Sequence, residues 1–137
     1  MYAVSVVIVT DQSREHIARC LRSVCSQEGV SFNVVLWDNA STDDTCKVIE
    51  KSLLPPFPNT TLIRHGEKLS SEAAVELAKL SARANYLCLL KPDAIFKKPQ
   101  DLARLLARAE KTSQTLVRND YAAKVSCFER LVAFFKK

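Results

Sequence analysis

The chain has 137 residues, a length that fits a single domain with one hydrophobic core. Its 47% apolar and 26% charged residues exclude a disordered chain and a collagen-like repeat. The only glycines, Gly29 and Gly66, lie too far apart for a Walker loop or a dinucleotide-binding fingerprint. The five cysteines form no C-x-x-C pair, which indicates reduced thiols in a cytosolic protein.

The net charge of +5 is unevenly distributed along the chain. Residues 1–96 carry ten Lys or Arg and eleven Asp or Glu, whereas residues 97–137 carry ten and four. The basic character therefore belongs to the last third of the sequence. We predict a main domain over residues 1–112 and a basic, helical extension over residues 113–137. The apolar side of its last helix would consist of Val125, Phe128, Val132 and Phe135.

Apolar runs of strand type alternate with amphipathic stretches of helical period. The pattern first predicts a strand at 4–9, a helix begun by Ser13, a strand at 32–37, and a helix begun by a capping box of Ser41 and Asp44. It then predicts a strand at 61–64, a helix from Ser70 or Ser71 to about Ala84, a strand at 86–90, and a helix around 102–109.

This order predicts an α/β fold with three layers, a mostly parallel sheet between helices. In such sheets ligands bind outside the carboxyl ends of the strands, where the strand order reverses. Polar side chains follow three of the predicted strands at that end: Thr10, Asp11, Asp38, Asn39 and Asp93. Asp also serves turns and helix starts routinely, so spacing alone leaves a structural role for Asp11 and Asp38 equally open.

Three segments resemble family 2 glycosyltransferases, which have the GT-A fold. They are the strand at 4–10, the sequence WDNASTDDT at 37–45, and LLKPDA at 89–94. The last is similar to the version of the family's D-x-D motif found in rhamnosyltransferase-like members. The resemblance covers roughly residues 3–110 and implies a truncated, nucleotide-diphospho-sugar-binding domain.

The resemblance assigns roles position by position. Thr10 and Asp11 would lie against the nucleotide base, and Asp38, followed by Asn39, would accept the N3–H of a pyrimidine. Asp93 would hold the Mg²⁺ or Mn²⁺ ion that bridges the donor diphosphate. Lys91 occupies the first D-x-D position, where its ammonium group would contact a phosphate directly or would be a tolerated surface change.

Two further departures from the family concern the donor pocket and the acceptor. The family's Asn-x-Gly aligns with Lys68, Leu69 and Ser70. Family members also continue into a second half that binds the acceptor and supplies a base. The only acids after the predicted fourth helix, Asp120 and Glu129, stand in no acceptor motif, so no catalytic residue is assigned.

The sequence therefore predicts a glycosyltransferase, or the donor-binding half of one, that uses a dTDP- or UDP-linked sugar. Its partner would be a second subunit or a separate acceptor domain. The alternative is a noncatalytic GT-A-like domain that binds nucleotide or serves as a protein scaffold. We expect the basic residues of 97–137 either to form a solvated surface or to contact an anionic membrane. The protein would then be cytoplasmic and, in the second case, peripheral to the membrane. Because no nucleic-acid motif accompanies them, we expect no nucleic-acid partner.

Overall fold

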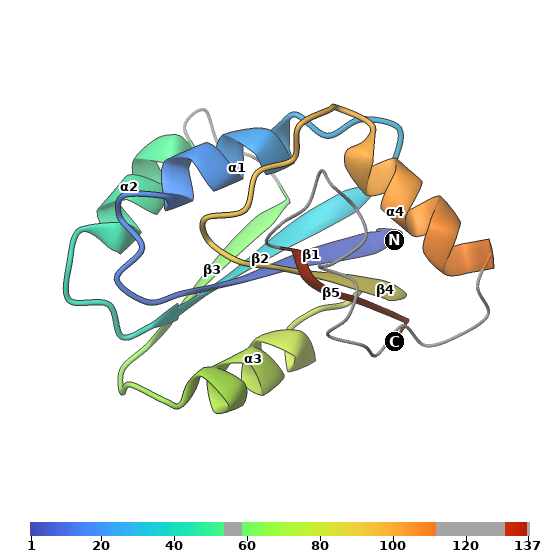
Figure 1. Cartoon of the computed structure of the whole chain (residues 1–137). Helices are drawn as coiled ribbons and strands as arrows, with labels where there is room; N and C mark the ends of the chain where they lie inside the picture. The colour runs from blue at the N-terminus through green and yellow to red at the C-terminus, as the bar shows by residue number, and fades with distance from the viewer. Residues whose placement is uncertain (54–58, 112–130, 137) are drawn as a thin grey trace.

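The computed structural model describes residues 1–53, 59–111 and 131–136, in which strands and helices alternate (Figure 1). The strands are β1 (Val4–Thr10), β2 (Phe32–Asn39), β3 (Thr60–His65), β4 (Tyr86–Leu90) and β5 (Leu131–Lys136). The helices are α1 (Ile17–Cys25), α2 (Thr45–Ser52), α3 (Ser71–Leu80) and α4 (Asp101–Lys111).

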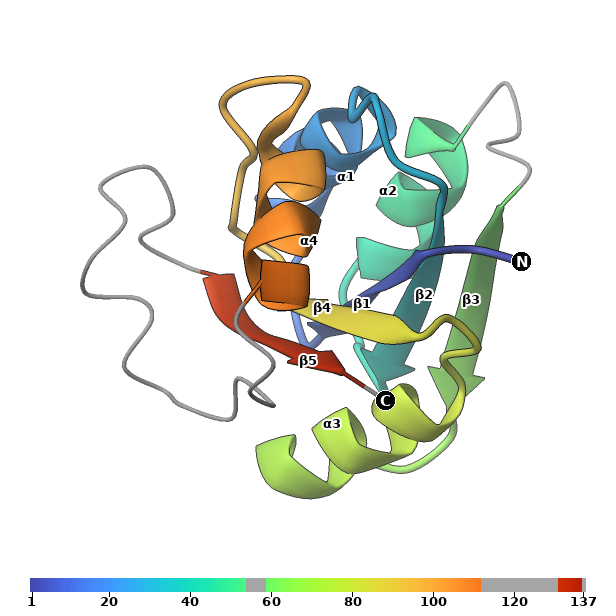
Figure 2. The ribbon, with the colours of Figure 1, turned by 90° about the vertical axis from the view of Figure 1, so that its right-hand side faces the viewer.

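The strands form one sheet in the order β3-β2-β1-β4-β5. The first four are parallel, and β5 pairs antiparallel with β4. Helices α1, α2 and α4 lie on one face of the sheet and α3 lies on the other (Figure 2). The predicted three-layer α/β fold is therefore confirmed. The chain builds outward from β1 to β3 and then crosses to β4 on the other side of β1, so the strand order reverses between β1 and β4.

The core is divided by the sheet into two clusters. Side chains alternate between the faces of β1, so that Val6 and Ile8 pack with α1 and α4 while Val7 packs with α3. All three are fully buried, which is why the strand reads as a continuous apolar run. On the α3 side the small residues Ala74 and Ala78 let the helix pack closely on β1 and β2.

Three helix boundaries differ from the prediction. Ser41 and Asp44 form no capping box at the start of α2, whose N-cap is Asp44, because the Ser41 hydroxyl donates to Asp38 instead. Ser13 does not cap α1, whose N-cap is His16, because the Ser13 hydroxyl instead accepts from the Asp11 amide and donates to the Asp11 carbonyl. Helix α3 is capped by Ser70, whose hydroxyl accepts from the Ala73 amide, but it ends at Leu80, not near Ala84.

The predicted helix through Val132 and Phe135 is wrong. Residues 131–136 form β5, which extends the sheet beyond β4. A short apolar run fits either a strand or a helix, and pairing with a strand distant in sequence decided the outcome here. The rest of the predicted extension, including Val125 and Phe128, lies outside the described residues. The domain boundary at 112 and the membrane contact stay predictions. Among the described helices, none is both long and apolar enough to cross a bilayer.

Burial of a thiol in α1 predicts a loss of stability at alkaline pH. Burial raises the pKa of Cys20 from 9.0 to about 12, with a smaller contribution from the charge of Asp93. The unfolded chain therefore releases this proton near pH 9, whereas the folded protein keeps it. Between these two pH values the free energy of unfolding falls by about 1.4 kcal/mol per pH unit on account of this group.

We expect the Cys20→Ala variant to lose stability less steeply than the wild type above pH 9, in urea unfolding measured across that window. The Val24→Ala variant, in the same buried face of α1, should lower stability at every pH without changing the slope. Parallel profiles for wild type and Cys20→Ala would show that the thiol does not carry the effect.

Candidate functional site

A pocket of about 270 Å³ opens at the carboxyl edge of the sheet, where the strand order reverses between β1 and β4. Three of the residues that we predicted from the sequence to bind the donor line it, namely Asp11, Asn39 and Lys91. The other lining residues are Val9, Ser13, Ser71, Val75, Leu89, Leu90 and Pro92. The pocket thus joins the ends of β1, β2 and β4 to the first turns of α3.

Asp11 is the accessible carboxylate of this pocket. Its side chain is 37% exposed, and Lys68, in the loop between β3 and α3, forms an ion pair with it at 3.1 Å. Lys68 itself is 63% exposed, so this pair lies in solvent and adds little to stability. The carboxylate and the ammonium group are therefore both accessible to a ligand at the pocket rim.

Asp38 lies behind the pocket and is nearly completely buried, at 3% exposure. Its Oδ1 accepts hydrogen bonds from the hydroxyls of Thr10 (2.8 Å) and Ser41 (2.6 Å), and its Oδ2 accepts from the Ser41 amide (3.0 Å). Thr10 is fully buried as well. In this structure Asp38 thus links the end of β1 to the loop after β2, the structural role that the sequence had left open.

Asn39 is engaged in a similar way. Its side-chain nitrogen donates to the Leu69 carbonyl (3.0 Å), and its side-chain oxygen accepts from the Leu69 amide (2.9 Å). The two bonds attach the loop between β3 and α3 to the end of β2. They place this loop, and with it Lys68, beside the pocket.

The loops after β1 and β2 are joined through Gln12. Its side-chain oxygen accepts from the amides of Thr42 and Asp43, and its side-chain nitrogen donates to the Thr42 hydroxyl at 2.7 Å. Both loops contain a non-glycine residue with left-handed backbone geometry, Gln12 (φ 51°) and Ala40 (φ 54°). Such geometry costs on the order of 1 kcal/mol at each residue and is held in place by the surrounding bonds.

The loop after β4 places Lys91 and Asp93 differently. Lys91 is exposed and lines the pocket, whereas Asp93 is outside its lining and lies close enough to Cys20 of α1 to raise the pKa of that thiol. Cys20 also donates a weak hydrogen bond to the Lys91 carbonyl, at 3.7 Å. Helix α1 therefore supports the turn that carries both residues.

In the described ranges no three His, Cys, Asp or Glu side chains group into a ready-made metal site. Mg²⁺ and Mn²⁺ in nucleotide sites commonly take only one or two carboxylates and complete their shells with phosphate oxygens and water. One carboxylate, Asp93, at the end of β4 is sufficient for that mode of binding, so the residues present fit such an ion.

The structure therefore brings together Asp11, Asn39 and Lys91 in one pocket, places Thr10 and Asp38 behind it, and leaves Asp93 beside it. The family's Asn-x-Gly aligns with Lys68–Ser70 and its Arg-Asn pair near Val75, both parts of the donor pocket in the family, and Val75 does line this pocket. The predicted order of parallel strands and helices also implies that α3, which follows β3, begins at the carboxyl edge. Sequence reasoning missed Ser71 in the lining and the pairing of Lys68 with Asp11.

Comparison with known proteins gives the same family as the motifs. The family model described as glycosyl transferase family 2 matches residues 5–136. An uncharacterized protein of Mycobacterium tuberculosis (strain CDC 1551 / Oshkosh) is 43% identical over 53 residues, which is 39% of this chain and 16% of that protein.

Two solved glycosyltransferase structures share the fold. Residues 1–349 of S. aureus TarS in complex with UDP superpose with a TM-score of 0.71 and 21% identity, over 82% of this chain and 33% of that TarS chain. A mannosyltransferase of Pyrobaculum calidifontis in complex with GDP-Man and Mn²⁺ gives a TM-score of 0.72 and 23% identity, over 84% of this chain and 34% of the enzyme. The chain thus spans about a third of the length of each. Because the family model matches nearly its whole length, the chain belongs to glycosyl transferase family 2.

Proposed function

We propose that this chain forms the donor-binding part of a glycosyltransferase and takes a dTDP- or UDP-linked sugar. The observation that carries the proposal is the pocket where β1 and β4 diverge, with a carboxylate on one side and an ammonium group on the other. Asp11 accepts the N3–H of the base, and Lys91 contacts the diphosphate. Asp38 is already bonded to Thr10 and Ser41. We therefore assign recognition of the base to Asp11 in this proposal, in place of Asp38.

Two further features support a nucleotide-sugar donor. The amino end of α3 reaches the pocket at Ser71, where its partial positive charge favours phosphate. TarS, which has the same fold, was solved with UDP, although the mannosyltransferase was solved with GDP-Man.

A divalent cation, Mg²⁺ or Mn²⁺, would be held by Asp93 together with the donor phosphates. When bound, it neutralises the charge that develops on the leaving diphosphate. The acceptor would be bound by a second subunit or by another domain, because the chain spans only a third of the length of its solved relatives. No residue of the described chain is assigned as the catalytic base.

The proposal is tested by calorimetric titration of the purified chain with UDP, dTDP and GDP, each with Mn²⁺ and with a chelator. We expect UDP and dTDP to bind more tightly than GDP, and more tightly with Mn²⁺ than without. If none of the three nucleotides binds under either condition, the noncatalytic alternative replaces the proposal. If GDP binds most tightly, the donor is a purine nucleotide sugar.

The Asp93→Asn variant tests the metal ligand. We expect it to bind UDP without metal as the wild type does and to lose the gain in affinity that Mn²⁺ gives, because an amide oxygen is a weaker ligand for a hard cation. The Asp44→Asn variant, at an exposed carboxylate that starts α2, is the matched control and should keep the Mn²⁺ effect. A full Mn²⁺ effect in Asp93→Asn would remove this residue from the metal site.

A further inference from the structure

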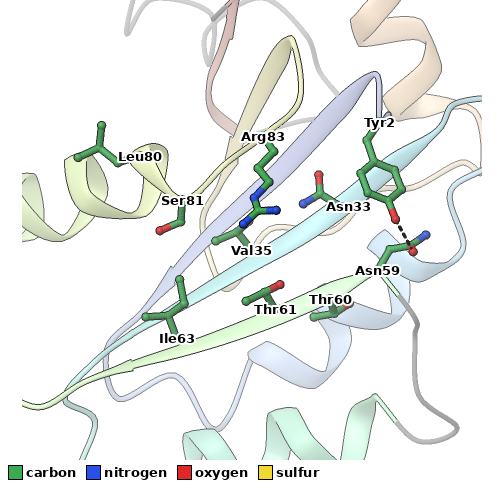
Figure 3. Close-up of a pocket in the computed structure, with 10 residues that line it drawn as sticks. All are labelled: Tyr2, Asn33, Val35, Asn59, Thr60, Thr61, Ile63, Leu80, Ser81 and Arg83. Carbon is green, nitrogen blue, oxygen red and sulfur yellow. Dashed lines mark hydrogen bonds between the residues drawn. The ribbon is translucent and has the colours of Figure 1, made fainter.

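A second pocket, of about 550 Å³, lies on the face of the sheet that carries α3, at the opposite end of that helix from the donor pocket (Figure 3). Its floor is formed by the amino-terminal halves of β2 and β3, and its sides by Tyr2, Asn59 and the carboxyl end of α3. Helix α3 packs on β1 and β2, and this pocket is the space between the helix and β3. Its size is in the usual range for a small-molecule site.

Among the described residues, Arg83, in the turn between α3 and β4, is the one cationic side chain that lines this pocket. Its guanidinium group extends over Val35 of β2, toward Asn33 (Figure 3). Across the part of the chain that the structure describes, no carboxylate forms an ion pair with Arg83, and no Asp or Glu lines the pocket.

The two asparagines of the pocket use their oxygens within the protein. Asn33 Oδ1 accepts from the Ser5 hydroxyl at 2.7 Å, and Asn59 Oδ1 accepts from the Tyr2 hydroxyl at 2.6 Å (Figure 3). The Asn33 NH₂ group lies on the side of Arg83, whereas the Asn59 NH₂ group points away from it (Figure 3). Because amide nitrogens and guanidinium groups only donate hydrogen bonds, Arg83 and Asn33 present two donors to the pocket.

We infer that this pocket binds a small anionic molecule through a carboxylate or phosphate group placed between Arg83 and Asn33. An oxyanion accepts from both donors, and the planar guanidinium matches either group bidentately. Arg83 is exposed, so the anion reaches it directly from solvent. The hydroxyls of Thr61 and Ser81 line the remainder of the pocket and suit the polar body of such a molecule.

The site is separate from the donor pocket in both residues and chemistry. No residue lines both pockets, and the two lie at opposite ends of α3, which at ten residues is about 15 Å long. Binding here and binding of UDP can therefore be measured independently, and failure of one does not affect the other.

The test is titration of the ¹⁵N-labelled chain with inorganic phosphate and, separately, with acetate, followed by NMR at constant ionic strength. We expect the side-chain NH₂ signals of Asn33 and the Arg83 Nε signal to shift together and saturate. The anion that saturates at the lower concentration identifies the preferred group, and saturation with acetate alone assigns the site to carboxylates.

The Arg83→Gln variant should lose these shifts, with at least a tenfold weaker apparent affinity. The matched control is Arg22→Gln, which makes the same change of charge on exposed α1, across the sheet, and should bind as the wild type does. Shifts that persist in Arg83→Gln, or that are lost equally in both variants, would overturn the inference. So would the absence of saturable shifts at these two side chains up to tens of millimolar of either anion.

Discussion

Replacing Asp38 with alanine is expected to destabilise the fold by about 3 kcal/mol and to abolish nucleotide binding. The substitution removes a buried carboxylate that accepts from the hydroxyls of Thr10 and Ser41 and from the Ser41 amide. These donors stay in a site that water does not reach freely, since Thr10 is fully buried. The turn that contains Ala40 in its left-handed geometry loses the bonds that hold it.

The measurement is urea unfolding followed by circular dichroism, together with UDP titration. The Asp38→Asn variant keeps the shape and one acceptor oxygen, so we expect it to fold and to lose about half as much stability. The Asp44→Ala control removes an exposed carboxylate paired only with Lys47 and should cost less than about 1 kcal/mol. If Asp38→Ala unfolds like this control but no longer binds UDP, Asp38 contacts the nucleotide directly, as the family resemblance first implied.

Replacing Lys91 with glutamine is expected to weaken UDP binding about tenfold while leaving stability unchanged. The ammonium group is exposed and lines the donor pocket, so a charge-assisted bond to a phosphate is lost without a cost to the folded state. The effect should be larger for UDP than for uridine, because the nucleoside has no phosphate.

Calorimetry at two salt concentrations checks this result. Wild-type binding should weaken with added salt, and the Lys91→Gln variant should respond less, because one ionic contact is gone. Lys97→Gln, six residues further along and outside the pocket lining, is the matched control. Equal affinities for UDP in wild type and Lys91→Gln would assign Lys91 to a tolerated surface change.

Much of the fold could be predicted because β1, β2 and β4 are short, apolar and buried on both faces. The fourth strand was predicted at its observed bounds, Tyr86–Leu90, and β1 within one residue. The errors arose where a segment made a hydrogen bond that its own pattern does not indicate. Ser13 reads as a helix cap, but its hydroxyl bonds to Asp11; Leu131–Lys136 reads as part of a helix, but its backbone pairs with β4.

The site was predictable in position but not in arrangement. Parallel strands bring their carboxyl ends to one edge, and this is why Asp11, Asn39 and Lys91 meet in one pocket. Which carboxylate faces the pocket follows from the alternation of side chains at the ends of β1 and β2, because Asp11 and Asn39 lie on the α3 side and Asp38 lies on the side of α2. Asp38 is the register partner of Thr10 and accepts from its hydroxyl, a contact between residues 28 apart in sequence that no local pattern indicates.

The bonds from Gln12 to Thr42 and Asp43 have a consequence for ligand affinity. They order one wall of the donor pocket when the chain folds, so a nucleotide that binds there does not have to restrict those two loops again. Lys68, at the pocket rim, pairs with Asp11 in solvent, while its neighbour Leu69 is bonded to Asn39. A bound base that takes the Asp11 carboxylate competes with that ion pair, so occupancy releases the Lys68 ammonium group toward the ligand's phosphates.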